Sequence, residues 1–156
     1  MDTKTVIGKA EKVDLPEQAV KATYARIDTG AKTSAIWAGS VQLTSKGLAV
    51  VFFAAGSPWF TGETVHFDSF EETVVVSSNG AAERRFKVRL VILLGGRRIR
   101  AWFTLADRST QVYPLLVGRN VLHGKFLVDV SFGSDALLAV ERERSELLRK
   151  QLTEES

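Results

Sequence analysis

Residues 25–34 read Ala-Arg-Ile-Asp-Thr-Gly-Ala-Lys-Thr-Ser and place an acid directly after a predicted strand. The strand ends at Ile27, and Asp28 follows on a turn. Thr29 offers a hydroxyl that can satisfy buried backbone groups, and Gly30 permits unusual backbone angles and the close approach of another chain segment. Asp-Thr-Gly also occurs in ordinary turns, where the aspartate accepts a backbone N–H. The stretch alone therefore leaves open a catalytic acid or a plain turn.

A two-residue period covers most of the remaining chain. It is clearest at 85–90, where Phe86, Val88 and Leu90 share one face and three basic residues share the other. Gly95-Gly96 supplies the positive φ angles of a tight turn, and the alternation resumes over 99–105. These residues predict a β-hairpin.

Further strands are predicted at 6–13, 20–28, 41–44, 48–53, 64–67, 73–77, 115–117, 126–131 and 136–140. Many short strands at this spacing indicate an all-β sandwich or small barrel. Helices are predicted at 119–123, which Gly124 ends, and at 141–152, which is rich in helix formers. We expect a main domain over 1–140 and a helical tail over 141–156, either solvated or docked on a neighbour.

Composition excludes several classes of site. The chain has 156 residues, no cysteine and two histidines, so Cys-ligated metals, cysteine nucleophiles and a three-histidine site are excluded. The net charge of +3 is too weak to indicate nucleic acid. Without a signal sequence or a long apolar run, we expect no membrane association and a cytoplasmic location. The segment 118–125 departs from the phosphate-loop pattern, and no cofactor is expected.

A second segment supports the catalytic interpretation of Asp28. Residues 113–122 read Tyr-Pro-Leu-Leu-Val-Gly-Arg-Asn-Val-Leu, which predicts a buried strand, a glycine and a short helix. Between the two segments lie the small-residue turn at 77–81 and the alternating hairpin. The order is therefore acid loop, small-residue hairpin tip, alternating strands, and a helix opened by Gly-Arg-Asn.

That order resembles the retropepsin-like aspartic proteases, and more closely the RimB-like family, also labelled ATP-dependent zinc proteases. The matching segments are Glu-Lys-Val-Asp-Leu-Pro at 11–16, the acid loop at 25–36, Ser-Ser-Asn-Gly with the charges that follow at 77–85, and 115–129. The resemblance implies a small closed β-barrel with one short helix and a C-terminal helix. The zinc and ATP of the label find no ligand cluster and no phosphate loop in this sequence, so no metal is expected.

The resemblance also implies roles for particular residues. The catalytic residue would be Asp28, on an active-site loop continued by Thr29, Gly30 and Ala31. The flap over the substrate would comprise Ser77, Ser78, Asn79 and Gly80. Structural support would come from Gly118, Arg119 and Asn120, with Asn120 capping the short helix or bridging to a strand.

Aspartic proteolysis needs two carboxylates that share one proton, whereas the chain has a single Asp-Thr-Gly. We therefore expect a C2 homodimer that pairs Asp28 with its copy. The substrate would be a peptide or protein, including added glutamyl tails.

Four alternatives remain open at this stage. The 77–80 turn could be a plain surface hairpin. Glu83 and Arg85 could pair with each other, act as solvated edge charges or recognise an acidic substrate. The whole chain could be a non-catalytic barrel that accompanies an ATP-grasp ligase. A nucleic-acid binder, based on the arginines at 84–100, is the weakest hypothesis.

Overall fold

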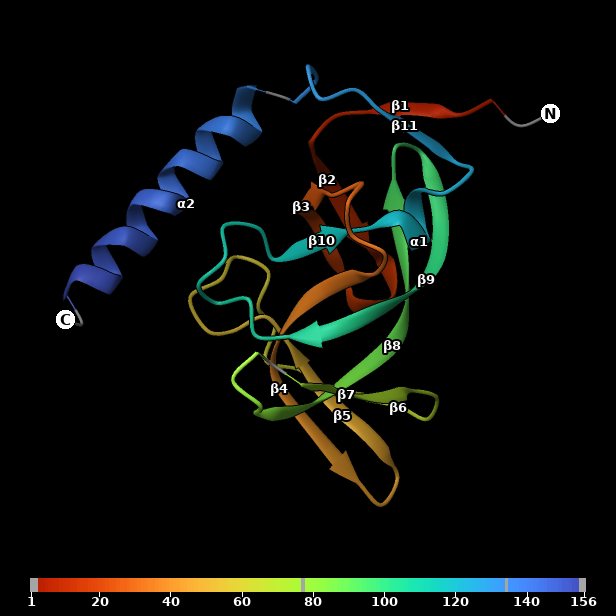
Figure 1. Ribbon diagram of the computed structural model, residues 1–156, viewed down its shortest axis with the longest axis vertical. Helices are drawn as coiled ribbons and strands as arrows, with labels where there is room; N and C mark the ends of the chain where they lie inside the picture. The colour runs from red at the N-terminus through yellow and green to blue at the C-terminus, as the bar shows by residue number, and fades with distance from the viewer. Residues whose placement is uncertain (1–2, 77, 134, 155–156) are drawn as a thin grey trace.

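The computed structural model describes residues 3–76, 78–133 and 135–154. Figure 1 shows a barrel of strands with one long helix beside it. The strands are β1 (Thr5–Ile7), β2 (Ala10–Leu15), β3 (Val20–Ile27), β4 (Ser34–Thr44), β5 (Gly47–Phe52), β6 (Val65–Phe67), β7 (Glu71–Val76), β8 (Ala82–Leu94), β9 (Arg97–Ala106), β10 (Leu115–Val117) and β11 (Phe126–Val128). The helices are the 3-10 turn η1 (Pro16–Gln18), α1 (Arg119–Leu122) and α2 (Asp135–Glu154).

Six strands close the barrel. They pair in the order β10-β3-β2-β8-β9-β4, and β10 pairs with β4 to complete the ring. Most pairs are antiparallel, but β3 with β10 and β4 with β9 are parallel. Outside the ring, β5 and β6 extend from β4, and β7 pairs with β8. The expected all-β barrel with a short helix and a C-terminal helix is confirmed.

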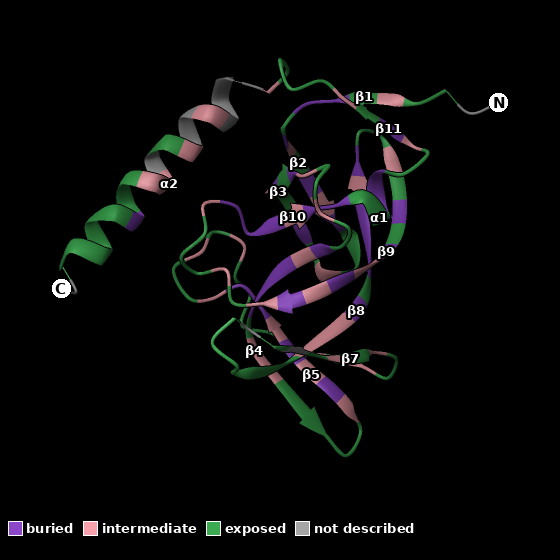
Figure 2. Ribbon diagram, viewed as in Figure 1, coloured by how far each residue is buried: buried purple, intermediate pink, exposed green. Residues whose placement is uncertain are grey.

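The apolar alternation of the sequence fills the barrel. Val88, Leu90 and Ile92 on β8 are at most 1% exposed, and Phe103 on β9 is fully buried. Figure 2 shows buried segments concentrated on the strands of the barrel and exposed segments on α2 and the hairpin ends. Removal of this apolar surface from water is the main stabilising term of the fold.

The predicted hairpin is confirmed as β8 and β9. Leu94 pairs with Arg97, and the two residues between them, Gly95 and Gly96, have φ angles of 56° and 78°. Positive φ at both central positions matches the right-handed twist of the flanking strands, which explains why two glycines stand here.

Several predicted boundaries are wrong. The strand predicted at 6–13 is two strands, because the chain turns at Gly8, where a Cβ would lie 2.4 Å from the carbonyl oxygen of Phe132. The strand predicted at 126–131 ends at Val128, and the strand predicted at 41–44 begins at Ser34. Neither boundary has a glycine or proline signal, so pairing with other strands sets them.

The strand predicted at 136–140 is also wrong, because these residues belong to α2. The run Ala-Leu-Leu-Ala-Val is apolar and short, so its period cannot separate a strand from a helix. Alanine and leucine favour the helix, and the helix formers that follow continue it. The helix predicted at 141–152 is confirmed and extends in both directions. Within the described residues, no helix has the length and apolar character of a membrane span.

Candidate active site

Asp28 directly follows the last residue of β3, and it adds one more hydrogen bond to the parallel pairing of β3 with β10. Its backbone N–H donates to the carbonyl oxygen of Val117 at 2.9 Å. Its Oδ1 accepts the N–H of Gly30 at 2.9 Å, and its carbonyl oxygen accepts the N–H of Ala31 at 3.3 Å. The carboxylate is half-buried and closes the turn, as an Asx turn does.

The helix α1 holds this loop by its backbone. The N–H groups of Arg119 and Asn120 donate to the carbonyl oxygens of Ala31 at 2.8 Å and Lys32 at 3.2 Å. The guanidinium of Arg119 donates to the carbonyl oxygen of Thr29 at 3.2 Å. The carbonyl groups of Thr29, Ala31 and Lys32 therefore all have donors on the segment that begins α1.

Gly118 is the point of closest approach between the two segments. A Cβ on Gly118 would lie 2.2 Å from the carbonyl oxygen of Thr33 and 2.8 Å from that of Ala31. The φ of this residue is −101°, so the demand for glycine comes from space and not from backbone conformation. The two segments can interlock only because this position has no side chain.

Ser34 joins the interlock to the barrel. It is 1% exposed, and its Oγ accepts the N–H of Gly118 at 2.9 Å while donating to Asn120 Oδ1 at 2.7 Å. Asn120 Nδ2 donates to the carbonyl oxygen of Trp102 on β9 at 2.9 Å. Asn120 thus bridges to strands, one of the two options that the sequence left open. Sequence reasoning missed Ser34, although it closes the same quoted stretch.

The proposed flap is the turn between β7 and β8. Ser77 lies outside the described residues. Ser78, Asn79 and Gly80 are exposed, Asn79 Oδ1 accepts the N–H of Ala81 at 3.1 Å, and Gly80 has a φ of +83°. The pairing of Val76 with Ala82 makes this segment a hairpin tip. Its role over a substrate stays a prediction.

A polar cleft of about 470 Å³ lies between the acid loop and the stem of this hairpin. Its walls combine four segments of the chain: Ala31, Thr33 and Ala35; Glu83 and Arg85; Thr104 to Arg108 with Gln111; and Leu116. Neither Asp28 nor the described tip residues 78–80 line it. The structure therefore brings the acid loop to the hairpin stem.

The profile of one family matches residues 6–134 and is described as RimB-like, retropepsin-like aspartic endopeptidase RimB. The chain belongs to the RimB-like family. Probable alpha-L-glutamate ligases of Shewanella pealeana and Shewanella halifaxensis are each 32% identical to it over 142 residues. These matches cover 83% of this chain and 29% of each ligase, so the chain spans less than a third of their length.

A solved structure shares the fold of this RimB-like chain. The crystal structure of Lpg0085, a protein of unknown function from Legionella pneumophila, has a TM-score of 0.61 and 24% identity. The similarity covers 83% of this chain and 96% of that one. The two proteins share the barrel fold.

Charged and polar residues that the sequence did not single out line the cleft of the RimB-like chain. Asp107, Arg108 and Gln111 lie on the loop that joins β9 to β10. Hydrogen bonds from Ser109 lower the pKa of Asp107, and burial, followed by the charge of Arg26, lowers the pKa of Arg108. The only signal for these residues was a polar run after a strand, which ordinary loops share.

Glu83 and Arg85 lie on the same wall of the cleft. Their charged groups are 3.6 Å apart, so the sequence interpretation as a mutual pair is correct for the free chain. Both side chains are substantially exposed, with 70% and 43% of their surface in solvent. The Glu83–Arg85 ion pair therefore contributes little free energy, and little is lost if a ligand replaces it.

The zinc named in the label of related proteins finds no ligand set here. Among residues 3–76, 78–133 and 135–154, no cluster of three or more His, Cys, Asp or Glu could hold a metal ion.

Proposed function

We propose that this RimB-like chain is an aspartic-type endopeptidase that works as a homodimer. The observation that carries the proposal is the way the fold holds Asp28. A half-buried carboxylate follows β3 on a loop whose carbonyl groups are held by Arg119 and Asn120, and the chain supplies one such acid. A two-fold axis beside the loop would bring the second acid from an identical chain.

The chemistry then follows from two carboxylates that cannot both ionise cheaply when they share a site. The ionised Asp28 accepts a proton from water, and the resulting hydroxide adds to the carbonyl carbon of the peptide. The protonated Asp28 of the other copy gives its proton to the carbonyl oxygen. The Asp28 that took the proton from water then gives it to the amide nitrogen, while the other Asp28 takes a proton from a hydroxyl of the tetrahedral intermediate as the C–N bond breaks. The products are a carboxylic acid and an amine, and the pair again holds one shared proton.

The substrate we propose is a peptide or protein segment, including added glutamyl tails. Two observations support an acidic substrate. Arg85 and Arg108 line the cleft next to the acid loop, together with Glu83 and Asp107, and guanidinium groups bind carboxylates well. The related proteins named above are probable glutamate ligases, so an enzyme that removes glutamates would act on the same kind of chain end.

The test is a digest of a peptide library, with glutamyl-tailed peptides included, by wild type and Asp28→Asn. Sedimentation of both proteins shows whether the dimer persists. We expect the Asn variant to lose at least about a thousandfold of the hydrolysis rate, because a removed general base or acid costs this order. Asp68→Asn, an exposed carboxylate outside the cleft, is the matched control. Undiminished hydrolysis by Asp28→Asn contradicts the proposal.

A second candidate function is a non-catalytic module that accompanies an ATP-grasp ligase. It is favoured by the match to part of the Shewanella ligases, where a similar region makes up 29% of the chain. If it is correct, the protein changes glutamate-ligase activity when added in trans, and Asp28→Asn does so equally well. An effect that disappears with Asp28→Asn assigns it to hydrolysis instead.

A further inference from the structure

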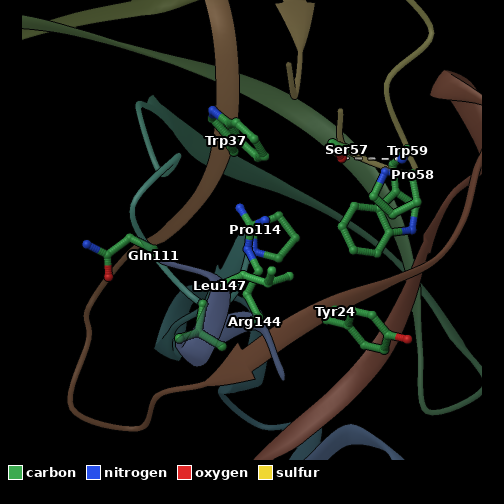
Figure 3. A pocket seen from close by; sticks show the side chains of 10 residues that line it. Tyr24, Trp37, Ser57, Pro58, Trp59, Gln111, Pro114, Arg144 and Leu147 are labelled. Carbon is green, nitrogen blue, oxygen red and sulfur yellow. Dashed lines mark hydrogen bonds between the residues drawn. The ribbon is translucent and has the colours of Figure 1, made fainter. Parts of the chain in front are cut away.

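A second cavity of about 270 Å³ lies on the α2 side of the barrel (Figure 3). Its apolar walls include Tyr24 of β3, Trp37 of β4, Trp59 and Pro114. Arg144 of α2 and Gln111 bring polar groups to it. Gln111 also lines the cleft beside the acid loop, so the two hollows are neighbours. Neither Asp28 nor its loop lines this cavity.

The aromatic wall is fixed in place by ring contacts. The rings of Tyr24 and Trp59 lie 5.4 Å apart, edge to face, and Phe53 packs against Trp59 at 5.9 Å and against Trp37 at 6.2 Å. Trp37 is only 6% exposed. Two of these three pairs are edge to face and the Phe53–Trp59 pair is tilted. Packing of this kind holds the rings in defined orientations, so they lose little conformational freedom when a ligand binds.

The guanidinium of Arg144, at the edge of the cavity, can bind an anionic partner. Arg144 Nη2 donates to the carbonyl oxygen of Ser109 at 3.4 Å, which is a long hydrogen bond. In the part of the chain that the structure describes, no carboxylate forms an ion pair with Arg144. A guanidinium can bind both oxygens of a carboxylate, and it does so best where an apolar wall reduces the competition from water.

We propose that this cavity binds the C-terminal residue of a peptide, with an aromatic side chain against Trp37 and Trp59 and the carboxylate on Arg144. The volume lies just below the roughly 300 Å³ at which pockets for drug-sized ligands begin, which fits one residue and not a long segment. A terminal aromatic residue carries both a carboxylate and a ring. The site does not depend on hydrolysis at Asp28.

The probe is N-acetyl-L-phenylalanine, followed by the indole N–H resonances in a two-dimensional NMR titration. The chain has three tryptophans, and Trp102 lies outside the cavity, where Arg89 covers its ring at 4.9 Å. We expect the signals of Trp37 and Trp59 to shift with the probe and that of Trp102 to stay. Single Trp→Phe variants assign the three signals.

Two further probes separate the ring from the carboxylate. N-acetyl-L-phenylalanine amide lacks the charge, and N-acetyl-L-alanine lacks the ring, so each should bind about tenfold more weakly or worse. Arg144→Gln should weaken the acid by about tenfold and leave the amide unchanged. Arg142→Gln, on an exposed position of the same helix away from the cavity, is the matched control and should change neither.

Three results overturn the proposal. The first is the absence of shifts at Trp37 and Trp59 up to about 10 mM probe, far above the affinity range of useful peptide sites. The second is equal binding of the acid and the amide by wild type, which needs no variant to fold. The third is an equal effect of the Arg144 and Arg142 substitutions. None of these three results bears on the Asp28 proposal, which the peptide digest tests separately.

Discussion

At the scale of single residues, space and hydrogen bonds around the acid loop decide which side chains are allowed. Gly118 is hemmed in by two carbonyl oxygens, and Ser34 is buried with both of its hydrogen-bonding roles in use. Neither residue needs to touch a substrate. Both place the loop that carries Asp28, so they act on any chemistry there through position.

Gly118→Ala should lower the free energy of unfolding by about 1–3 kcal/mol, because the new methyl group forces apart backbones that cannot yield cheaply. Urea unfolding followed by circular dichroism measures this. Gly133→Ala is the control, since a Cβ there meets only the flexible side chain of Lys9 at 3.6 Å. Equal stability of the two variants would show that the two segments are not interlocked.

Ser34→Ala should cost about 1–3 kcal/mol of unfolding free energy, because the buried N–H of Gly118 loses its acceptor. The same urea titration measures it. Ser40→Ala, half-buried on the same strand, serves as the comparison and should change stability by less than about 1 kcal/mol. A cost at Ser40 as large as that at Ser34 contradicts the assignment.

At the scale of elements, two side-chain hydrogen bonds join α2 to the loop between β9 and β10. Tyr113 Oη donates to Glu141 at 2.6 Å, and Arg144 donates to the carbonyl oxygen of Ser109. The same loop supplies Asp107, Arg108 and Gln111 to the cleft. The helix therefore steadies a wall of the cleft without lining it.

The Tyr113 hydroxyl gives this contact a pH dependence. Burial, the hydrogen bond to Glu141 and its negative charge raise the pKa of Tyr113 far above the ordinary value of about 10. The folded chain thus holds this proton more tightly than the unfolded chain, so the contribution to stability is complete below about pH 10 and is lost as pH rises through the raised pKa. We expect unfolding midpoints in urea to fall above about pH 10, and to fall less steeply in Tyr113→Phe. The same slope in wild type and variant would contradict this.

At the scale of the whole molecule, each barrel carries one Asp28 loop, and the polar cleft lies beside that loop. If two chains share one active site, activity depends on the composition of the dimer and not on the number of intact chains. Mixing wild type with Asp28→Asn after subunit exchange should make activity follow the square of the wild-type fraction. A linear dependence would mean that each chain works alone. Native mass spectrometry of the mixture, with one of the two proteins isotopically labelled, confirms that exchange has occurred.

Much of the barrel could be predicted because its strands show the two-residue alternation of apolar and polar residues, which is visible within a short stretch of sequence. The β8–β9 hairpin is one example, since alternating residues and Gly95-Gly96 lie within a short stretch. The start of β4 at Ser34 and the helix at 136–140 could not, because the first depends on pairing with distant strands and the second on a run too short to show its period.

The sequence by itself determined the alternating faces of the strands, the tight turn and the two segments that carry Asp28 and Gly118, because each depends on neighbouring residues. Tertiary structure alone decided that Ser34 would be the buried acceptor for Gly118, that Asp107 and Arg108 would face the hairpin stem, and that an aromatic cavity would form under Arg144. These contacts join residues far apart in the chain. They arise only when the closed barrel fixes all of its strands at once, and no local pattern encodes that closure.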